Sequence, residues 1–176
     1  MVYNYKIKVT LKGLEKQIKR VFVINDNVKI NDFCKAVIMS MNGYLGHLYT
    51  LKYKDKYYIC EHMDKNGFDE IKMNSLRINK LMLEEKDKLE LIYDFGDNWV
   101  FKIKVAKVVT GHNNKNIELI DGIGKGIEED CGGTWRLIDL INDKNNHWNY
   151  NYEDFDMNRI NDELDKKILE EFEKSK

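Results

Sequence analysis

The segment from Tyr93 to Trp99, YDFGDNW, places two carboxylates and an indole around one glycine. Carboxylates that are held close together can bind a metal ion, accept a proton or orient a substrate. The same residue types also form tight turns, because Gly and Asn adopt left-handed backbone angles and Asp accepts hydrogen bonds from nearby amides. The segment is therefore a candidate site and a candidate turn at once.

A second candidate segment, Asp130-Cys131-Gly132-Gly133, directly precedes a predicted helix. A carboxylate at a helix start is stabilised by free backbone amides and the helix dipole, so the residue types have a structural explanation. The alternatives are an anion-binding turn, or a Cys131 thiol that acts as a nucleophile because its pKa is lowered. No histidine stands in a recognisable local arrangement with this cysteine, so the structural interpretation is favoured.

His47 supplies an imidazole that could join the carboxylates of Asp94, Asp97 and Asp130. One imidazole and several carboxylates are adequate ligands for a divalent metal, and a metal-dependent hydrolase or nuclease is one interpretation of these four residues. Acidic residues are common, however, and chance alone produces such sets. We therefore expect no metal and no cofactor, and the sequence leaves any catalytic residue unassigned.

Alternating apolar residues on both sides of the YDFGDNW segment predict a hairpin over residues 89–105. A three-residue loop from Gly96 to Asn98 would pair Phe95 with Trp99 and make every pair on that face apolar. Loops of this kind place their last residue in the left-handed region, which Asn98 tolerates. We expect Tyr93 and Trp99 to line a groove beside the glycine-rich segment.

The rest of the chain predicts a β-β-α-β-β start similar to a β-grasp, in which a helix with Asn31 as its N-cap covers a hairpin. The C-terminal part predicts a short strand and two helices. The predicted elements outside the central hairpin are strands over 3–11, 20–24, 48–53, 56–60 and 117–120, and helices over 31–42, 76–83, 134–141 and 158–172.

The composition favours one α+β domain over residues 1–176, with a mixed, mostly antiparallel sheet and C-terminal helices. Hydrophobic residues make up 43% of the chain and charged residues 34%. No apolar run reaches the roughly 18 to 20 residues of a membrane span, and the start lacks the apolar stretch of a signal peptide. We therefore expect a cytoplasmic protein with no membrane partner.

The formal net charge of −1 weighs against a general nucleic-acid binder, but the charge is unevenly distributed. Residues 1–20 carry six Lys or Arg against one Glu, and residues 121–176 carry eight basic against fifteen acidic side chains. Solvated faces of opposite sign are the favoured interpretation. The alternative is a DNA-binding protein whose basic N-terminal hairpin uses Lys6, Lys8, Lys12, Lys16, Lys19 and Arg20.

Five segments together resemble the plasmid pRiA4b ORF-3-like family, first named from an Ri plasmid. The segments, which span nearly the whole chain, are YKIKVTLKG at the start, HLYTL at 47–51, YDFGDNW at 93–99, EDCGG at 129–133 and FDMNRIN at 155–161. The chain departs from the family pattern in lacking a Pro-Trp-Arg stretch after the first strand and the prolines before DCGG. The resemblance implies a fold and an association with mobile elements, but no reaction.

The sequence therefore predicts a non-enzymatic binding or accessory module whose partner, a protein or a nucleic acid, is unknown. Its recognition surface is expected around Tyr93 to Trp99 and Asp130 to Gly133, together with His47, if these segments meet in space. The oligomeric state is left open.

Overall fold

The computed structural model describes residues 2–67, 69–111, 115–143 and 148–174, with side chains described as far as residue 167. Within these residues, eight strands form one sheet in the order β5-β4-β3-β6-β7-β1-β2-β8. All neighbouring strands are antiparallel except β4 and β5. The α+β fold class predicted from the sequence is thus confirmed.

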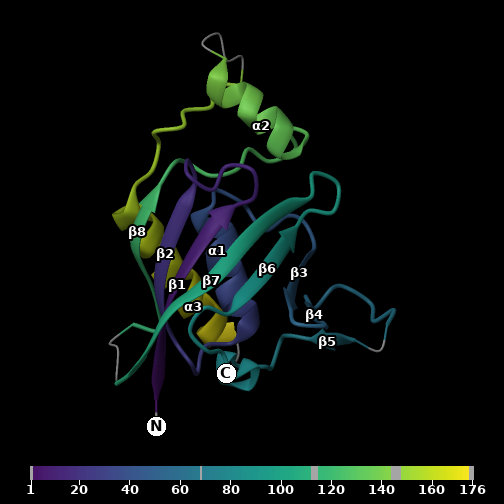
Figure 1. Ribbon diagram of the computed structural model, residues 1–176, viewed down its shortest axis with the longest axis vertical. Coiled ribbons are helices and arrows are strands. Elements are labelled where there is room, and N and C mark those ends of the chain that lie inside the picture. Colours follow the sequence, from purple (N-terminus) through teal and green to yellow (C-terminus); the bar gives the residue numbers. More distant parts are fainter. Residues whose placement is uncertain (1, 68, 112–114, 144–147, 175–176) are drawn as a thin grey trace.

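The chain order contains the predicted β-β-α-β-β start, followed by the central hairpin and the C-terminal helices (Figure 1). The elements are β1 (Tyr3–Leu11), β2 (Lys19–Asn25), α1 (Ile30–Ser40), β3 (Tyr49–Tyr53), β4 (Lys56–Ile59), β5 (Glu70–Lys72), the 3-10 helix η1 (Ile78–Leu81), β6 (Lys88–Tyr93), β7 (Trp99–Thr110), β8 (Ile117–Ile123), α2 (Gly133–Asn142) and α3 (Met157–Lys174). No helix in the described part of the chain combines the length and the apolar character of a membrane span.

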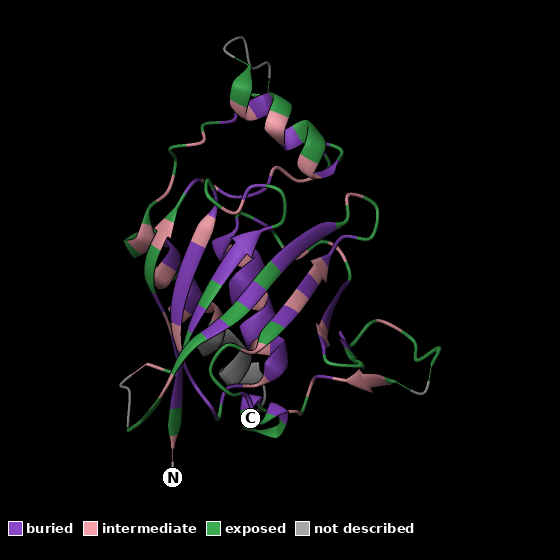
Figure 2. Cartoon of the chain, in the orientation of Figure 1, coloured by how far each residue is buried: buried purple, intermediate pink, exposed green. Residues whose placement is uncertain are grey.

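Helices α1 and α3 lie behind the sheet, whereas α2 stands beyond one end of it (Figure 1). Side chains of β1 alternate between the two faces of the sheet, so Ile7, Val9 and Leu11 are buried on the face that α1 covers. Phe33 and Val37 of α1 belong to the same core. Figure 2 shows this alternation of buried and exposed positions along β1 and β7. Within the residues that the structure describes, the opposite face of the sheet is left without a helix (Figure 1).

The hairpin between β6 and β7 differs from the predicted register. Tyr93 pairs with Trp99, so the connection has five residues, 94–98, in place of three, and the predicted pairing of Phe95 with Trp99 is wrong. The strand ends early because Asp94 adopts a φ of 55° and donates its amide to the Leu48 carbonyl, while its own carbonyl accepts the Asn98 amide at 2.6 Å. Asn98 has a φ of 54°, the left-handed backbone expected of it.

The start of α1 also differs from its prediction. The helix begins at Ile30 after Lys29, and no side chain caps its first amides. Asn31 therefore is not the N-cap; it lies inside the helix, where its Oδ1 accepts the Tyr49 hydroxyl at 2.7 Å. A buried hydrogen bond between α1 and β3 thus replaces the local cap that the sequence suggested.

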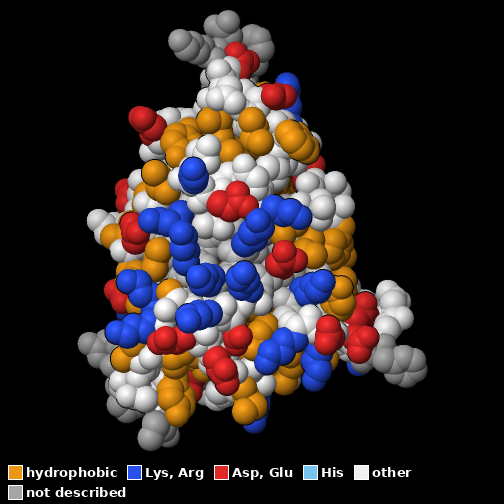
Figure 3. All heavy atoms as spheres, in the orientation of Figure 1, with side chains coloured by type: hydrophobic (Ala, Val, Ile, Leu, Met, Phe, Trp, Pro, Cys, Tyr) orange, Lys and Arg blue, Asp and Glu red, His pale blue; other side chains and the backbone are white. Residues whose placement is uncertain are grey.

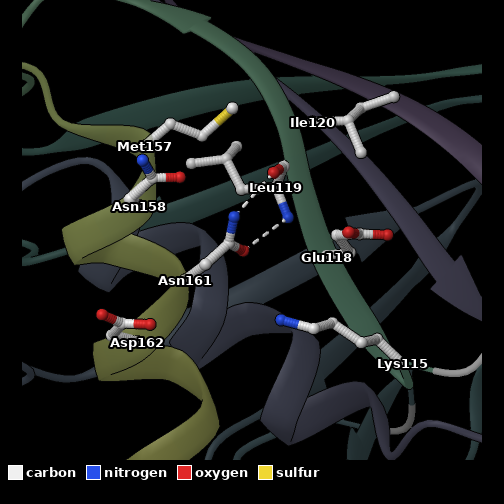
Figure 4. Close-up of a pocket in the computed structure, with 8 residues that line it drawn as sticks. All are labelled: Lys115, Glu118, Leu119, Ile120, Met157, Asn158, Asn161 and Asp162. Carbon is white, nitrogen blue, oxygen red and sulfur yellow. Dashed lines mark hydrogen bonds between the residues drawn. The ribbon is translucent and has the colours of Figure 1, made fainter.

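At Leu119, the outer edge of β8 is hydrogen-bonded to a side chain of α3 (Figure 4). Asn161 accepts the Leu119 amide at 2.9 Å through Oδ1 and donates to the Leu119 carbonyl at 2.8 Å through Nδ2. A strand at this position would make the same two bonds with its backbone. Asn161, within the family-like segment FDMNRIN, therefore joins α3 to the sheet.

We predict that Asn161→Ala lowers the free energy of unfolding by about 1–3 kcal/mol, because two backbone groups lose their partner. Urea denaturation followed by circular dichroism measures the change. Asn158→Ala is the matched control, since Asn158 is exposed one turn earlier on the same helix. Equal effects of the two substitutions would contradict a specific role for Asn161.

Candidate functional site

Three segments that are far apart in the sequence converge at one end of the sheet. The first follows α1 and carries Tyr44 and His47, the second is the 94–98 connection with Asp94, and the third precedes α2 and carries Glu129 and Asp130. The segments YDFGDNW and EDCGG, whose meeting in space the sequence left open, are therefore neighbours.

His47 lies at the centre of this cluster. Its Nδ1 is 3.7 Å from Asp94 Oδ1, and its Nε2 is 3.5 Å from Glu129 Oε2 and 3.4 Å from Asp130 Oδ1. These separations exceed the usual 2.7–3.2 Å of a hydrogen bond. His47, Asp94 and Glu129 each offer a ligand atom, and these atoms all lie within 4.8 Å of one another.

Glu129 is oriented by two hydrogen bonds to a single oxygen. Its Oε1 accepts the Tyr93 hydroxyl at 2.7 Å and the Tyr44 amide at 2.9 Å. The other oxygen, Oε2, is buried and has no hydrogen-bond partner, and the same is true of His47 Nε2. Burial, followed by the Glu129 hydrogen bond, raises the pKa of Tyr93, so this hydroxyl stays a donor to the carboxylate.

The backbone at the site is held in less favourable conformations. Leu45, Asp94 and Asp130 have φ values of 63°, 55° and 58°, so each converging segment contains a non-glycine residue in the left-handed region. In addition, Asp94 Oδ1 accepts the Gly96 amide at 2.9 Å, which fixes the side chain beside His47. Such conformations cluster at functional sites because surrounding contacts must hold them.

The charges of the cluster are not balanced by the described residues. His47 is the only basic group among them within 4.0 Å of Asp94, Glu129 or Asp130. Tyr44 adds one neutral contact, donating its hydroxyl to Asp130 Oδ2 at 3.0 Å. Three carboxylates around one imidazole form a set whose negative charge a divalent cation would largely offset.

Asp97, which the sequence grouped with His47, belongs to a different contact. Its Oδ2 accepts the Gly132 amide at 3.1 Å, and a Cβ added to Gly133 would lie 2.5 Å from the Asp97 carbonyl oxygen. Gly133, at a φ of 81°, is therefore required where the hairpin connection meets the start of α2. Asp97 joins the two family-like segments and does not approach the imidazole as a ligand.

One expectation and one alternative interpretation at the site are contradicted by burial. Tyr93 and Trp99 are both 0% exposed, so they form core behind the site and cannot line a groove. Cys131 is buried, and burial together with the Asp97 charge raises the pKa of its thiol to about 11. A thiol with a raised pKa is the opposite of an activated nucleophile.

Glu129 is the residue that sequence reasoning missed. It is the first residue of EDCGG, but the neighbouring Asp130 was the carboxylate selected, because it precedes a predicted helix. The structure reverses these roles, because Asp130 makes no helix cap and the side chain of Glu129 is only 7% exposed. A carboxylate shortly before a Gly-Gly turn is a weak sequence signal of a functional site. Only its burial in the folded protein distinguishes Glu129 from other acidic residues.

The fold and site define an α+β protein whose sheet has one face without a helix among the described residues, and whose sheet end carries a partly buried imidazole–carboxylate cluster. The profile of the family described as "Plasmid pRiA4b ORF-3-like protein" matches residues 3–171, and the chain belongs to this family. The resemblance of the five segments is thereby confirmed over nearly the whole chain.

Two relatives extend the comparison. The chain is 22% identical over 133 residues to "Uncharacterized protein y4hQ" of Sinorhizobium fredii (strain NBRC 101917 / NGR234), covering 74% of this chain and 67% of the relative. It is also similar in structure to the protein of unknown function MM3350 from Methanosarcina mazei Go1, with a TM-score of 0.77 and 20% identity over 90% of this chain and 96% of that one. The second likeness shows a shared fold.

We predict that none of the three cysteines reacts with iodoacetamide in the native protein at pH 8. All three are buried, and a pKa of about 11 leaves a thiolate fraction on the order of one in a thousand at that pH for Cys131. Intact-mass spectrometry after one hour measures the modification, and a sample in guanidinium chloride is the control. Rapid single modification at Cys131 would restore the nucleophile hypothesis.

Proposed function

We propose that this protein is a metal-dependent hydrolase that holds one divalent cation between His47, Asp94 and Glu129. The observation that carries the proposal is the pair of buried atoms without partners, His47 Nε2 and Glu129 Oε2, which face each other at 3.5 Å. Buried polar atoms in folded proteins are almost always satisfied. A cation between these two atoms would satisfy both. The Asp94 carboxylate, whose Oδ1 lies 3.7 Å from the other ring nitrogen, is the third candidate ligand of the set whose atoms lie within 4.8 Å of one another.

A protonated imidazole shared among the carboxylates is the structural alternative. It would place one positive charge beside three negative ones and would leave contacts of 3.4–3.7 Å, which are long for charge-assisted hydrogen bonds. A divalent cation would balance the charge better. The ligand set of one nitrogen and two carboxylates suits Zn²⁺ or Mn²⁺.

Three protein ligands leave coordination positions for water and substrate, which is the arrangement of catalytic metal sites. A cation bound there would lower the pKa of its water and supply a nucleophile near neutral pH. Asp130 lies at the exposed rim, with a side chain 66% exposed, and we assign it as the group that would accept a proton from that water. Glu129 is kept in position by Tyr93 and Tyr44, as outer partners position metal ligands.

A non-enzymatic binding module, the function predicted from the sequence, is the second candidate. It is supported by a pocket of about 470 Å³ between the 94–98 connection and α2, which includes Lys12, Asp97 and Trp135 in its wall. The indole of Trp135 is 84% exposed, which is unusual for so large an apolar group. Association with mobile elements stays a prediction from the family resemblance.

We predict that the wild-type protein, stripped with EDTA, binds one equivalent of Mn²⁺ or Zn²⁺ and becomes more stable. A free metal concentration of 100 times the Kd would add about 2.7 kcal/mol to the free energy of unfolding. Glu129→Gln should abolish this response without lowering the melting temperature of the metal-free protein, because Gln keeps an oxygen for Tyr93 and Tyr44.

Calorimetric titration and thermal melting with each metal measure the effect. Glu153→Gln, a loss of the same charge at an exposed position, is the matched control and should respond like the wild type. Absence of a metal response in the wild type, or an equal response in Glu129→Gln, would overturn the metal site.

Hydrolysis is tested separately on the metal-loaded protein with bis-p-nitrophenyl phosphate and p-nitrophenyl acetate. We expect cleavage of at least one substrate, and we expect Asp130→Asn to lower kcat by about 100-fold while metal affinity is retained. If the metal binds and neither substrate is cleaved, the metal site stands and the hydrolase assignment made on these substrates fails.

A further inference from the structure

The sheet face without helices carries lysines in register on three neighbouring strands. Lys8 of β1 lies opposite Lys104 of β7, and Lys104 lies opposite Lys88 of β6. Lys6 of β1 lies opposite Lys107 of β7, and Lys12 follows the end of β1. These residues are all exposed, and Figure 3 shows Lys and Arg side chains gathered across the middle of this face. We call Lys6, Lys8, Lys12, Lys88, Lys104 and Lys107 the lysine face.

Like charges directly opposite each other on adjacent strands destabilise a sheet. The neighbouring Lys19 and Lys102 are compensated, since their amines lie 2.8 Å from Asp121 and 2.6 Å from Glu15. By contrast, no residue of the lysine face has a carboxylate within 4.0 Å among the side chains that the structure describes. The fold thus keeps a repulsive array where alternating signs would be more stable.

We propose that the lysine face binds the phosphate backbone of double-stranded nucleic acid. Adjacent strands lie about 4.8 Å apart, so the array presents closely spaced positive charges on one surface, to which the phosphates of a duplex can bind. Single strands are bound by sheet faces through aromatic rings that stack on bases. In the described part of β1, β6 and β7, the outward positions next to these lysines hold Thr10, Glu90 and Lys102, none of which is aromatic.

This surface differs from the basic hairpin predicted from the sequence. Arg20 is 0% exposed and cannot reach a phosphate, and Lys19 is paired with Asp121. Lys88, Lys104 and Lys107 come from the central hairpin and take their place. The acidic residues that make the net charge −1 are concentrated after residue 121, so the chain total hides a local positive patch.

The inference is independent of the proposed metal centre, and its test is made in EDTA so that failure of one does not affect the other. Fluorescence anisotropy would follow binding of the full-length protein to a labelled 20-base-pair DNA duplex between 50 and 200 mM KCl. We expect the association constant to fall as the salt concentration rises. The slope of its logarithm against the logarithm of the salt concentration should be negative, with a magnitude no larger than about 5 for six lysines.

Lys8→Gln combined with Lys104→Gln should weaken duplex binding at least tenfold and leave the melting temperature unchanged or raised, because a repulsion is removed. The matched control, Lys65→Gln with Lys80→Gln, removes the same charge from exposed positions away from this face and should bind as the wild type does. A duplex RNA of the same sequence shows whether the shared phosphate chemistry extends to both nucleic acids.

Several results would overturn the proposal. They are no duplex binding at 50 mM KCl, equal weakening in both double variants, tighter binding of the single strand than of the duplex, or retention on phosphatidylserine vesicles without duplex binding. A lower melting temperature of Lys8→Gln with Lys104→Gln would instead assign these lysines a structural role and would also overturn it.

Discussion

The guanidinium of Arg20 is the contact on which the arrangement at the sheet end depends. It is fully buried, and it donates to five backbone carbonyls, those of Lys19, Ser40, Ile123, Gly124 and Lys125. Its carbon lies 4.4 Å from the centre of the Phe155 ring. A buried charge without a carboxylate partner is costly unless dipoles replace its water, and these carbonyls do so. Burial lowers its pKa to about 10, which still leaves it charged at neutral pH.

The carbonyl partners of Arg20 connect it to the candidate site. Ser40 is the last residue of α1, directly before the segment that carries Tyr44 and His47, and Lys125 begins the segment that leads to Glu129. The third segment is held to the first because the Asp94 amide bonds the Leu48 carbonyl. Because one side chain sets the spacing of two segments, the imidazole and the carboxylates can meet although all of them lie in connecting segments.

Much of the fold could be predicted from the sequence because side-chain alternation and helical spacing report directly on burial. The hairpin illustrates both the success and its limit. The predicted register was wrong by two residues, yet Leu89, Leu91 and Trp99 still face the core, since an even shift preserves the face of every side chain. The shift itself depended on Asp94 leaving the strand, which required a hydrogen bond to Leu48, more than forty residues away.

The candidate site was harder to predict from the sequence than the fold, because it too depends on contacts between distant segments. His47, Asp94 and Asp130 could be selected because their types suit the chemistry, but Asp97 looked equal to them and Glu129 looked like an ordinary surface acid. Glu129 differs from Asp97 in its burial and in the direction of its side chain. Both arise from contacts between distant segments, including the Tyr93 hydroxyl on Glu129 and the Gly132 amide on Asp97.

The Asn161 amide at the border of β8 also limits how copies of this chain can associate. An added strand at that border would have to displace the Asn161 side chain from Leu119, so α3 acts there as a terminator of sheet growth. The other border, β5, is a strand of only three residues in the described chain. Edge-to-edge association is therefore hindered at Leu119 on one border and limited by the shortness of the strand at the other.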